Sequence, residues 1–351
     1  MAKQDYFTQR TTVVLNRLEN TLNGLPYFLR QYFLGIENVT SPLTRLNYAV
    51  DLTIFFDFIS KKYDVPPEEL EIEILNELNA TDIETFLSYL SSFTYNGERH
   101  VCNEKAKARK LASIRSMYKY FFNKDMIVAN TAAKVATPKL HDKEIIRLDN
   151  KEIKDLLSVA ETGDGLTEHQ KSYQKNTSVR DVALLTLFLG TGIRISELVG
   201  LNIEDIFFDT NSFIVTRKGG NKTILYFTDE VKEELEKWLV IRNEDEKVKK
   251  NERALFTSLR GDRLSVRAVQ ELVKKYAKVI TPLKKITPHK LRSTFGTKLY
   301  RETGDIYVVA DYLGHKDINT TKRHYAAISD DIRRNAIGKI VLKDDKEDND
   351  K

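Results

Sequence analysis

Two segments decide how this chain is interpreted: ITPHKLRSTFGTKLY at residues 286–300 and DYLGHKDINTTKRHY at residues 311–325. In the first, His289 and Arg292 are three residues apart, so they share one face if the segment is helical. The spacing therefore predicts an imidazole and a guanidinium side by side on one helix face.

The second segment adds His315 and, ten residues later, Tyr325. A guanidinium can hold two phosphate oxygens with its planar fork, and imidazole exchanges protons near neutral pH. A phenol becomes an oxygen nucleophile when its weak acidity is assisted. Together these side chains suit chemistry on a phosphate diester, provided that they converge in space.

The composition is that of a globular protein with room for two domains. The chain has 351 residues, 41% of them hydrophobic and 30% charged, with a formal net charge of +5. No apolar run reaches the length of a membrane helix, and the start of the sequence lacks the apolar core of a secretory signal. We therefore expect a cytoplasmic protein. Its single cysteine, Cys102, excludes an internal disulfide and a cysteine-rich zinc site and is most simply a bystander thiol, and the basic balance permits nucleic-acid binding.

The first 130 residues are predicted to form an all-helical domain. Ser41 and Pro42 open one amphipathic helix, and Thr81 with Glu84 has the spacing of a helix-capping box. Residues 103–123 combine cations with apolar residues at helical spacing. This basic face is either solvated or in contact with phosphates. A stretch of mixed character, residues 131–148, is interpreted as an interdomain linker.

The second domain, residues 149–342, is predicted to be mostly helical with one small antiparallel sheet. A helix capped near Asp149 is followed by a polar insertion and a strongly apolar helical stretch that breaks at residues 190–192. Residues 207–227 are rich in β-branched and aromatic residues between turn residues, which is typical of strands and a hairpin. Helices resume from Asp229, and the tail at residues 343–351 is expected to be disordered.

Two further patterns join the opening segments. TGIRISELVGL at residues 191–201 places Arg194 in apolar surroundings, where a buried guanidinium needs an anionic partner. Glu197, one turn on, is one such partner, and a bound phosphate is another. TRKGGNKTILYF at residues 216–227 places Lys218 and Lys222 around a glycine turn.

In this order, the patterns resemble the tyrosine recombinases of the phage integrase family, and within it the Xer type. The resemblance is strongest from Arg180 to Ile328 and weaker over residues 40–125, which resemble the family's core-binding domain. It implies a two-domain C-shaped clamp round DNA. It also implies a catalytic set consisting of Arg194, Lys218, His289, Arg292, His315 and the nucleophile Tyr325, with Lys222 as the alternative lysine.

The sequence departs from the family pattern at two positions. Ser293 stands where the family usually carries a second histidine after the arginine. The family usually places its tyrosine nine residues after the second motif's histidine, and here that position is His324, with Tyr325 one residue later. Either the loop before the nucleophile has one extra residue, or the site is altered. We favour the first interpretation, because Ala326 and Ala327 still follow the tyrosine.

The resemblance implies cleavage through a 3′-phosphotyrosine, with no metal and no cofactor. Arg194 and Arg292 are expected to hold the nonbridging phosphate oxygens. His289 would assist the nucleophile or bind the phosphate, and His315 would donate a hydrogen bond to it. Lys218 would protonate the departing 5′-oxygen.

Double-stranded DNA with an inverted-repeat core site is the partner that the resemblance implies. A homo-tetramer is expected on synapsed DNA, a monomer or dimer in its absence, and an accessory host protein is a further candidate partner. The amphipathic segment after Tyr325 would pack within its own chain or against a neighbouring subunit. Candidate phosphate contacts are Arg45, Lys107, Arg109, Lys110, Arg115, Lys290 and Lys322.

The biological role and two competing functions stay open at this level. Chromosome dimer resolution and integration or excision of a mobile element use the same chemistry. The short stretch before the core-binding pattern leaves little room for the arm-binding domain of many element integrases, which favours the first role. The alternatives are a DNA-binding protein of recombinase descent without cleavage activity, and a relaxing enzyme of the type IB topoisomerase kind.

Overall fold

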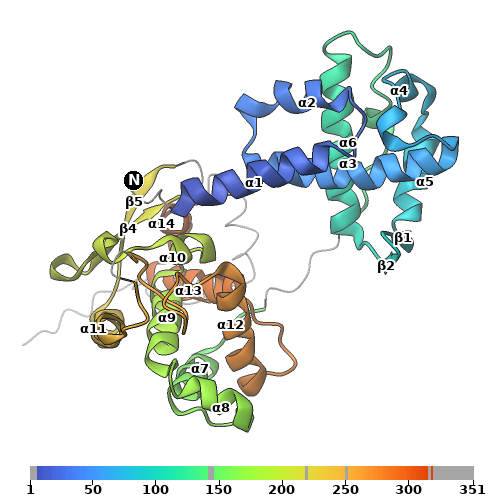
Figure 1. Ribbon diagram of the computed structural model, residues 1–351. Helices are drawn as coiled ribbons and strands as arrows, with labels where there is room; N and C mark the ends of the chain where they lie inside the picture. The colour runs from blue at the N-terminus through green and yellow to red at the C-terminus, as the bar shows by residue number, and fades with distance from the viewer. Residues whose placement is uncertain (1–5, 141–145, 218–219, 250–251, 315–317, 319–351) are drawn as a thin grey trace, which may run out of the picture. The chain divides into compact units, whose positions relative to one another are not determined.

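The protein is described by a computed structural model that covers residues 6–140, 146–217, 220–249, 252–314 and 318 (Figure 1). The chain divides into two compact units, residues 1–143 and 144–351. Helices dominate both units, and the small antiparallel sheet expected in the second half is present. The predicted fold class, mainly helical with a small sheet, is confirmed. Within the described residues, no helix is long and apolar enough to span a membrane.

The first unit is a helical bundle around an apolar core. Its regular elements are α1 (Tyr6–Leu22), α2 (Leu29–Gly35), α3 (Pro42–Tyr63), α4 (Ile74–Glu77), α5 (Ala80–Tyr89), β1 (Phe93–Tyr95), β2 (Glu98–His100) and α6 (Glu104–Phe122), with short 3-10 turns between them. Aromatic side chains fill the core, including Phe55, Phe86 and Tyr118, all fully buried. Burial of such rings supplies most of the driving force for packing α3, α5 and α6 together.

The start of α3 was predicted correctly, and the start of α5 was not. Ser41 caps α3 by accepting a hydrogen bond from the Thr44 backbone N–H at 3.2 Å. Helix α5 begins two residues earlier than expected, because Asn79 and not Thr81 is its cap. Asn79 accepts from the Asp82 backbone N–H and Asp82 accepts in return, which satisfies two free donors at once.

The expectation of an all-helical first unit was wrong. Strands β1 and β2 form a hairpin in which Tyr95 pairs with Glu98 across a two-residue turn. The turn residues Asn96 and Gly97 both have positive φ, at 49° and 77°. Asn-Gly is the dipeptide that such a turn favours, so the signal was present in the sequence between two short polar strands.

The second unit surrounds one strongly apolar helix. Its elements are α7 (Asn150–Thr162), α8 (Glu168–Gln174), α9 (Ser178–Thr191), α10 (Ile195–Gly200), β3 (Ile206–Phe207), β4 (Ser212–Thr216), β5 (Lys222–Tyr226), α11 (Asp229–Glu244), α12 (Val266–Ile280), α13 (Pro288–Thr303) and α14 (Ile306–Leu313). Helix α9 packs against α7, α11 and α13, and most of its side chains are buried. Asp149 caps α7 as predicted, with Glu152 completing a capping box.

The sheet of the second unit has the strand order β3-β4-β5, antiparallel throughout. In the β4–β5 pair, Thr216 lies opposite Lys222, so the two strands end together at the turn that follows Arg217. The predicted hairpin is confirmed. Its described part, and the end of α14, form the surroundings of the candidate site.

Candidate active site

Arg194 is positioned by the break between α9 and α10. Helix α9 ends at Gly192, whose φ of 58° is left-handed and where a Cβ would fall 2.4 Å from the Phe295 ring. Only glycine allows this close approach to α13 without strain. Arg194 then precedes α10 in extended conformation, and its backbone N–H donates to Glu197 at 3.0 Å.

The Arg194 guanidinium is held by a carboxylate on one side. Its Nη1 donates to Glu197 Oε1 at 2.7 Å, and the Glu197 side chain is 4% exposed against 30% for Arg194. The expected partner of Arg194 is therefore present. Because Glu197 fixes Arg194 by both backbone and side chain, the guanidinium keeps one orientation while part of it stays accessible to an anion.

Arg292 approaches the same place from α13. Pro288 occupies the first turn of this helix, and Arg292 one turn further on is 7% exposed. Its Nη1 donates to the Gly192 carbonyl at 2.5 Å, and its Nη2 donates to the Leu313 carbonyl. The second arginine thus ties the end of α9 to the end of α14.

The two arginines meet at the C-terminal end of α14. The Leu313 carbonyl accepts from Nη2 of both Arg194, at 3.0 Å, and Arg292, while the Gly314 carbonyl accepts from Arg194 at 2.8 Å. A helix C-terminus carries partial negative charge, which favours cations there. The structure therefore brings together two predicted site residues that are far apart in the sequence, directly before His315.

A third arginine, which the sequence reading did not select, joins them. Arg217 follows β4, and its Nη2 donates to the Tyr312 carbonyl at 2.8 Å. Burial lowers the pKa of the Arg217 guanidinium, and the nearby Arg194 charge lowers it further, against the raising effect of Glu197 and Asp311. In the sequence, the feature that could have identified Arg217 was its position directly before Lys218, at the end of an amphipathic strand.

His289 and Ser293 lie on one side of the same α13 turn. His289 is exposed, and its carbonyl accepts a hydrogen bond from the Ser293 hydroxyl at 3.0 Å. Ser293 itself is 8% exposed. A hydroxyl that bonds back to its own helix needs no other partner, so the position that departs from the family pattern is satisfied locally.

Four predicted residues lie outside the described part of the chain: Lys218, His315, Lys322 and Tyr325. The segment after Tyr325 and the tail lie outside it as well. Lys222, the alternative lysine, is described as an exposed residue that opens β5. The assignments of the four residues therefore rest on the sequence motifs.

The predicted phosphate contacts of the first unit have partners inside the protein. Arg45 is buried against Glu37 at 2.6 Å, and Lys110 is buried against Asp51 at 2.9 Å. Arg115 donates to the Ala132 and Val135 carbonyls and to Thr137. These contacts favour structural roles for the three cations, the last of which holds residues 132–137 against α6.

Of the other two cations of the first unit, Arg109 is exposed, whereas the Lys107 side chain is only 13% exposed. Arg109 also pairs with Asp51 but has a side chain that is 49% exposed. Lys107 donates to the Ser91 hydroxyl at 2.8 Å and lies 3.5 Å from the Glu104 carboxylate. In the second unit, Lys290 is half-buried on α13.

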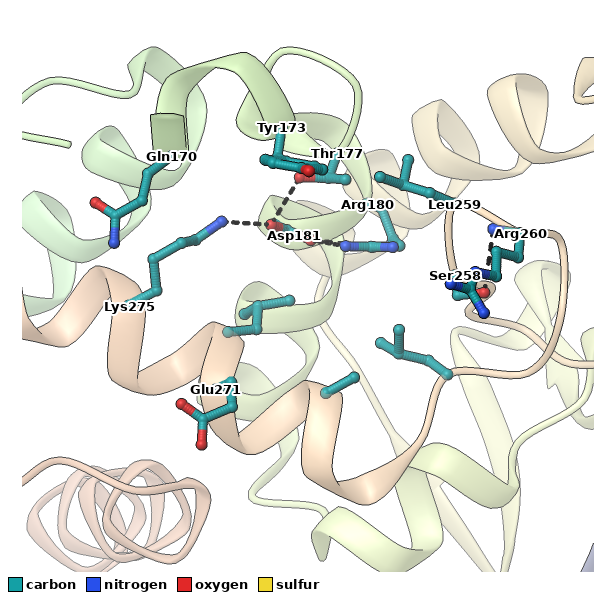
Figure 2. A pocket seen from close by; sticks show the side chains of 13 residues that line it. Gln170, Tyr173, Thr177, Arg180, Asp181, Ser258, Leu259, Arg260, Glu271 and Lys275 are labelled. Carbon is teal, nitrogen blue, oxygen red and sulfur yellow. Dashed lines mark hydrogen bonds and ion pairs between the residues drawn. The ribbon is translucent and has the colours of Figure 1, made fainter. Parts of the chain in front are cut away.

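A separate charged cluster lines an open pocket of about 620 Å³ between α8, α9, α12 and the loop after Ser258 (Figure 2). Its centre is Asp181, which is fully buried and accepts from Arg180 at 2.7 Å and from Tyr276 at 2.7 Å. Lys275 lies 3.4 Å from the same carboxylate, and burial lowers the pKa of this lysine. Because the cations share a buried carboxylate, this cluster is an internal ion-pair network and not an anion site.

The comparisons with known proteins agree with the motifs. The model of the phage integrase family matches residues 146–331. A tyrosine recombinase XerC from Caldanaerobacter subterraneus subsp. tengcongensis is 33% identical, over 86% of this chain and 82% of that protein. A tyrosine recombinase XerS from Streptococcus uberis is 30% identical, over 94% of this chain and 100% of that protein.

Solved structures show the same fold at lower sequence identity. XerH recombinase bound to palindromic difH substrate has a TM-score of 0.67 and 18% identity, covering 92% of this chain and 88% of that chain. A lambda integrase dimer bound to a COC′ core site has a TM-score of 0.60, covering 84% and 93%. The family model spans more than half of the chain, and the chain therefore belongs to the phage integrase family and is a site-specific tyrosine recombinase, an enzyme that cleaves and rejoins DNA.

Proposed function

We propose that Tyr325 attacks the scissile phosphate of a DNA strand, with Arg194 and Arg292 holding the nonbridging oxygens. The new bond joins the tyrosine oxygen to phosphorus, and the bond from phosphorus to the 5′-oxygen breaks. The DNA is then held as a 3′-phosphotyrosine, and a 5′-hydroxyl from another strand can reverse the step because the diester energy is retained. The observation that supports this proposal best is the meeting of both guanidiniums at the Leu313 carbonyl.

The two arginines have complementary parts in this mechanism. Glu197 orients Arg194 while leaving its side chain 30% exposed, so Arg194 is the more accessible of the two to an entering phosphate. Arg292, held by the Gly192 carbonyl, is fixed before substrate arrives. Donors that are already oriented stabilise the charge of the pentacoordinate transition state without a reorganisation cost.

The remaining roles follow from the motifs. Lys218 protonates the departing 5′-oxygen. We assign this role to Lys218 because it directly precedes the glycine turn of the β4–β5 hairpin. His315, immediately after the carbonyls that hold the arginines, donates a hydrogen bond to the phosphate. His289, exposed on α13, assists Tyr325 or binds the phosphate. The cationic side chains offset the charge that a metal ion offsets in other phosphoryl-transfer enzymes.

For DNA binding we propose that the first unit contributes Arg109 and Lys107, and that Lys290 and Lys322 act beside the catalytic residues. Phosphate contacts of this kind supply most of the affinity and make it salt-dependent. The exposed half of the Arg109 side chain supports its selection over the buried Lys110.

We further propose an inverted-repeat core site, a tetramer on synapsed DNA and a housekeeping role in resolving chromosome dimers. The names and coverage of the XerC and XerS relatives support this role over that of a mobile-element integrase. The fold alone does not distinguish the two, because lambda integrase shares it. The neighbourhood of the gene, searched for an inverted repeat, offers a direct check.

The experiment first selects, from a pool of random DNA duplexes, one that the protein binds. A nick beside the cleavage position of this duplex then lets the covalent protein–DNA complex accumulate. We expect wild type to give an adduct on a denaturing gel, Tyr325→Phe to give none, and His324→Ala to retain it. An adduct that survives Tyr325→Phe would show that the nucleophile is misassigned. Relaxation of plasmids that lack the site would instead favour a topoisomerase-like enzyme.

A further inference from the structure

Arg217 is fixed in place by the turn of the β4–β5 hairpin. Its backbone N–H donates to the Asn221 carbonyl at 2.8 Å, and its own carbonyl accepts from the Gly220 N–H at 3.0 Å. These two hydrogen bonds fix the backbone of Arg217 and therefore the direction in which its side chain leaves the hairpin. The side chain extends to the end of α14, a segment 95 residues later in the chain.

Two hydrogen bonds connect this hairpin with α14. Arg217 Nη2 donates to the Tyr312 carbonyl at 2.8 Å, and the Tyr312 hydroxyl donates to the Tyr226 carbonyl at 2.6 Å. The approach is so close that a Cβ at Gly314 would fall 1.3 Å from Arg217 Nη1. The Arg217 guanidinium therefore lies beside the carbonyls that receive Arg194 and Arg292.

The Arg217 guanidinium is incompletely paired. Its Nε and Nη1 are buried, and neither has an acceptor among the residues that the structure describes. Such donors are unfavourable, because they have lost water without gaining a partner. The positive charge of Arg194 nearby adds repulsion, and within the described residues no carboxylate forms an ion pair with Arg217.

Arg242, in the same unit, lacks this feature. Arg242 is also buried and also donates to backbone carbonyls, to Ala254 at 2.9 Å and to Glu252 at 2.7 Å. Burial lowers the pKa of Arg242 too. Its buried donors are nevertheless satisfied, and it stands outside the arginine cluster, so it serves as the matched reference for Arg217.

We propose that Arg217 is a third phosphate-binding arginine of this recombinase, whose unpaired Nε and Nη1 receive a nonbridging oxygen of the scissile phosphate. The inference rests on the proposed function, since it concerns the same phosphate. Arg217 offsets charge and takes no part in bond making or proton transfer.

The test compares two substrates that differ in charge. One nicked duplex carries the ordinary scissile phosphate, and the other carries a methylphosphonate there, which replaces one charged oxygen by a methyl group. We expect Arg217→Ala to form adduct about 100-fold more slowly than wild type on the phosphate. On the methylphosphonate, the deficit relative to wild type should shrink severalfold, because less charge needs to be offset.

Controls separate phosphate binding from folding. Arg242→Ala should show the same deficit, whatever its size, on both substrates. Arg217→Gln, which is neutral but keeps an amide donor for the Tyr312 carbonyl, replaces Arg217→Ala if circular dichroism shows that the alanine variant is unfolded. Equal deficits of the neutral Arg217 variant on both substrates, or a wild-type rate on the phosphate, would overturn the inference. Absence of adduct with wild type would instead contradict the proposed function.

Discussion

The two units each contain a cluster of cations, and the clusters differ in what the cations surround. In the first unit, Arg109, Lys110 and Ser113 all donate to Asp51, a carboxylate with no exposed surface. In the second unit, Arg194 and Arg292 share a neutral carbonyl, that of Leu313. A carbonyl accepts hydrogen bonds but does not cancel charge. In the first cluster, two cations share one buried carboxylate. In the second, Glu197 pairs with Arg194, and Arg217 adds a third guanidinium beside Arg194 and Arg292. The second cluster therefore holds more positive charge for an entering anion.

The acceptor that a cation contacts helps to distinguish a structural role from a functional one. The Asp181 cluster of the second unit follows the first pattern, with Arg180 and Lys275 around a buried carboxylate. At the end of α14, by contrast, two guanidiniums from different segments of the chain donate to the same backbone oxygen. A bound phosphate can compete with such oxygens, because charge-assisted hydrogen bonds are the stronger ones.

The largest effect is expected at the carbonyl-centred cluster. Arg292→Lys keeps a positive charge but loses the planar fork, so adduct formation should fall by about 10²–10³-fold. Single-turnover adduct formation on the nicked duplex measures this. Arg263→Lys is the control, since Arg263 also donates to carbonyls, those of Val199 and Leu201, outside the site. Similar losses for both variants would mean that the cluster has no special role.

The carboxylate-centred cluster should respond in stability instead. Asp51→Ala leaves Lys110, whose side chain is 5% exposed, buried without its anion. The free energy of unfolding should fall by about 3–5 kcal/mol, as measured by urea denaturation. Asp57→Ala, which removes the exposed partner of Lys61, should cost less than about 1 kcal/mol. A cost for Asp51→Ala as small as for Asp57→Ala contradicts the structural role.

The pH dependence of stability tests the contact between the hairpin and α14. Burial raises the pKa of the Tyr312 hydroxyl to about 12 from its ordinary value of 10.0. Between these values the unfolded chain loses this proton while the folded chain keeps it, so stability falls as pH rises. Wild type should lose roughly 1–2 kcal/mol more than Tyr312→Phe over this window. Tyr307→Phe, at an exposed tyrosine of α14, should behave as wild type.

The smallest effect is expected on the salt dependence of DNA binding, which should differ between Arg109 and Lys110, two neighbours that share Asp51. Arg109→Ala is expected to reduce the salt dependence of DNA binding by about one unit of slope, because its exposed half reaches a phosphate. Lys110→Met should leave the slope unchanged and reduce stability. Equal slopes for Arg109→Ala and wild type, from binding titrations at several salt concentrations, would remove Arg109 from the DNA interface.

The sequence was most informative where local pattern determines structure. Ser41, Pro42 and Asp149 mark helix starts correctly, because capping and first-turn preferences depend on a few adjacent residues. The same logic failed at Thr81, because a competing cap, Asn79, lay two residues earlier with a better-placed partner. The motifs also selected Arg194 and Arg292, and the structure brings these two together.

What the sequence could not show depends on contacts between distant segments. Asp51 lies in α3, and nothing local predicts that Lys110, 59 residues later in the chain, is buried against it. For that reason the basic face of α6 was predicted as a single set of candidate phosphate contacts, whereas its members differ in burial. Arg217 was passed over for the same reason, because its partners belong to α14.

Mapping the covalent adduct tests the central claim most directly. Wild type is incubated with the nicked duplex, quenched and digested, and mass spectrometry identifies the peptide that carries the DNA-derived phosphate. We predict phosphotyrosine at Tyr325, formed by wild type and reduced about 10²–10³-fold in Arg292→Lys. Phosphate attached to any other residue, or equal yields from the two proteins, would contradict the assignment of the arginine cluster at α14 as the receptor of the scissile phosphate.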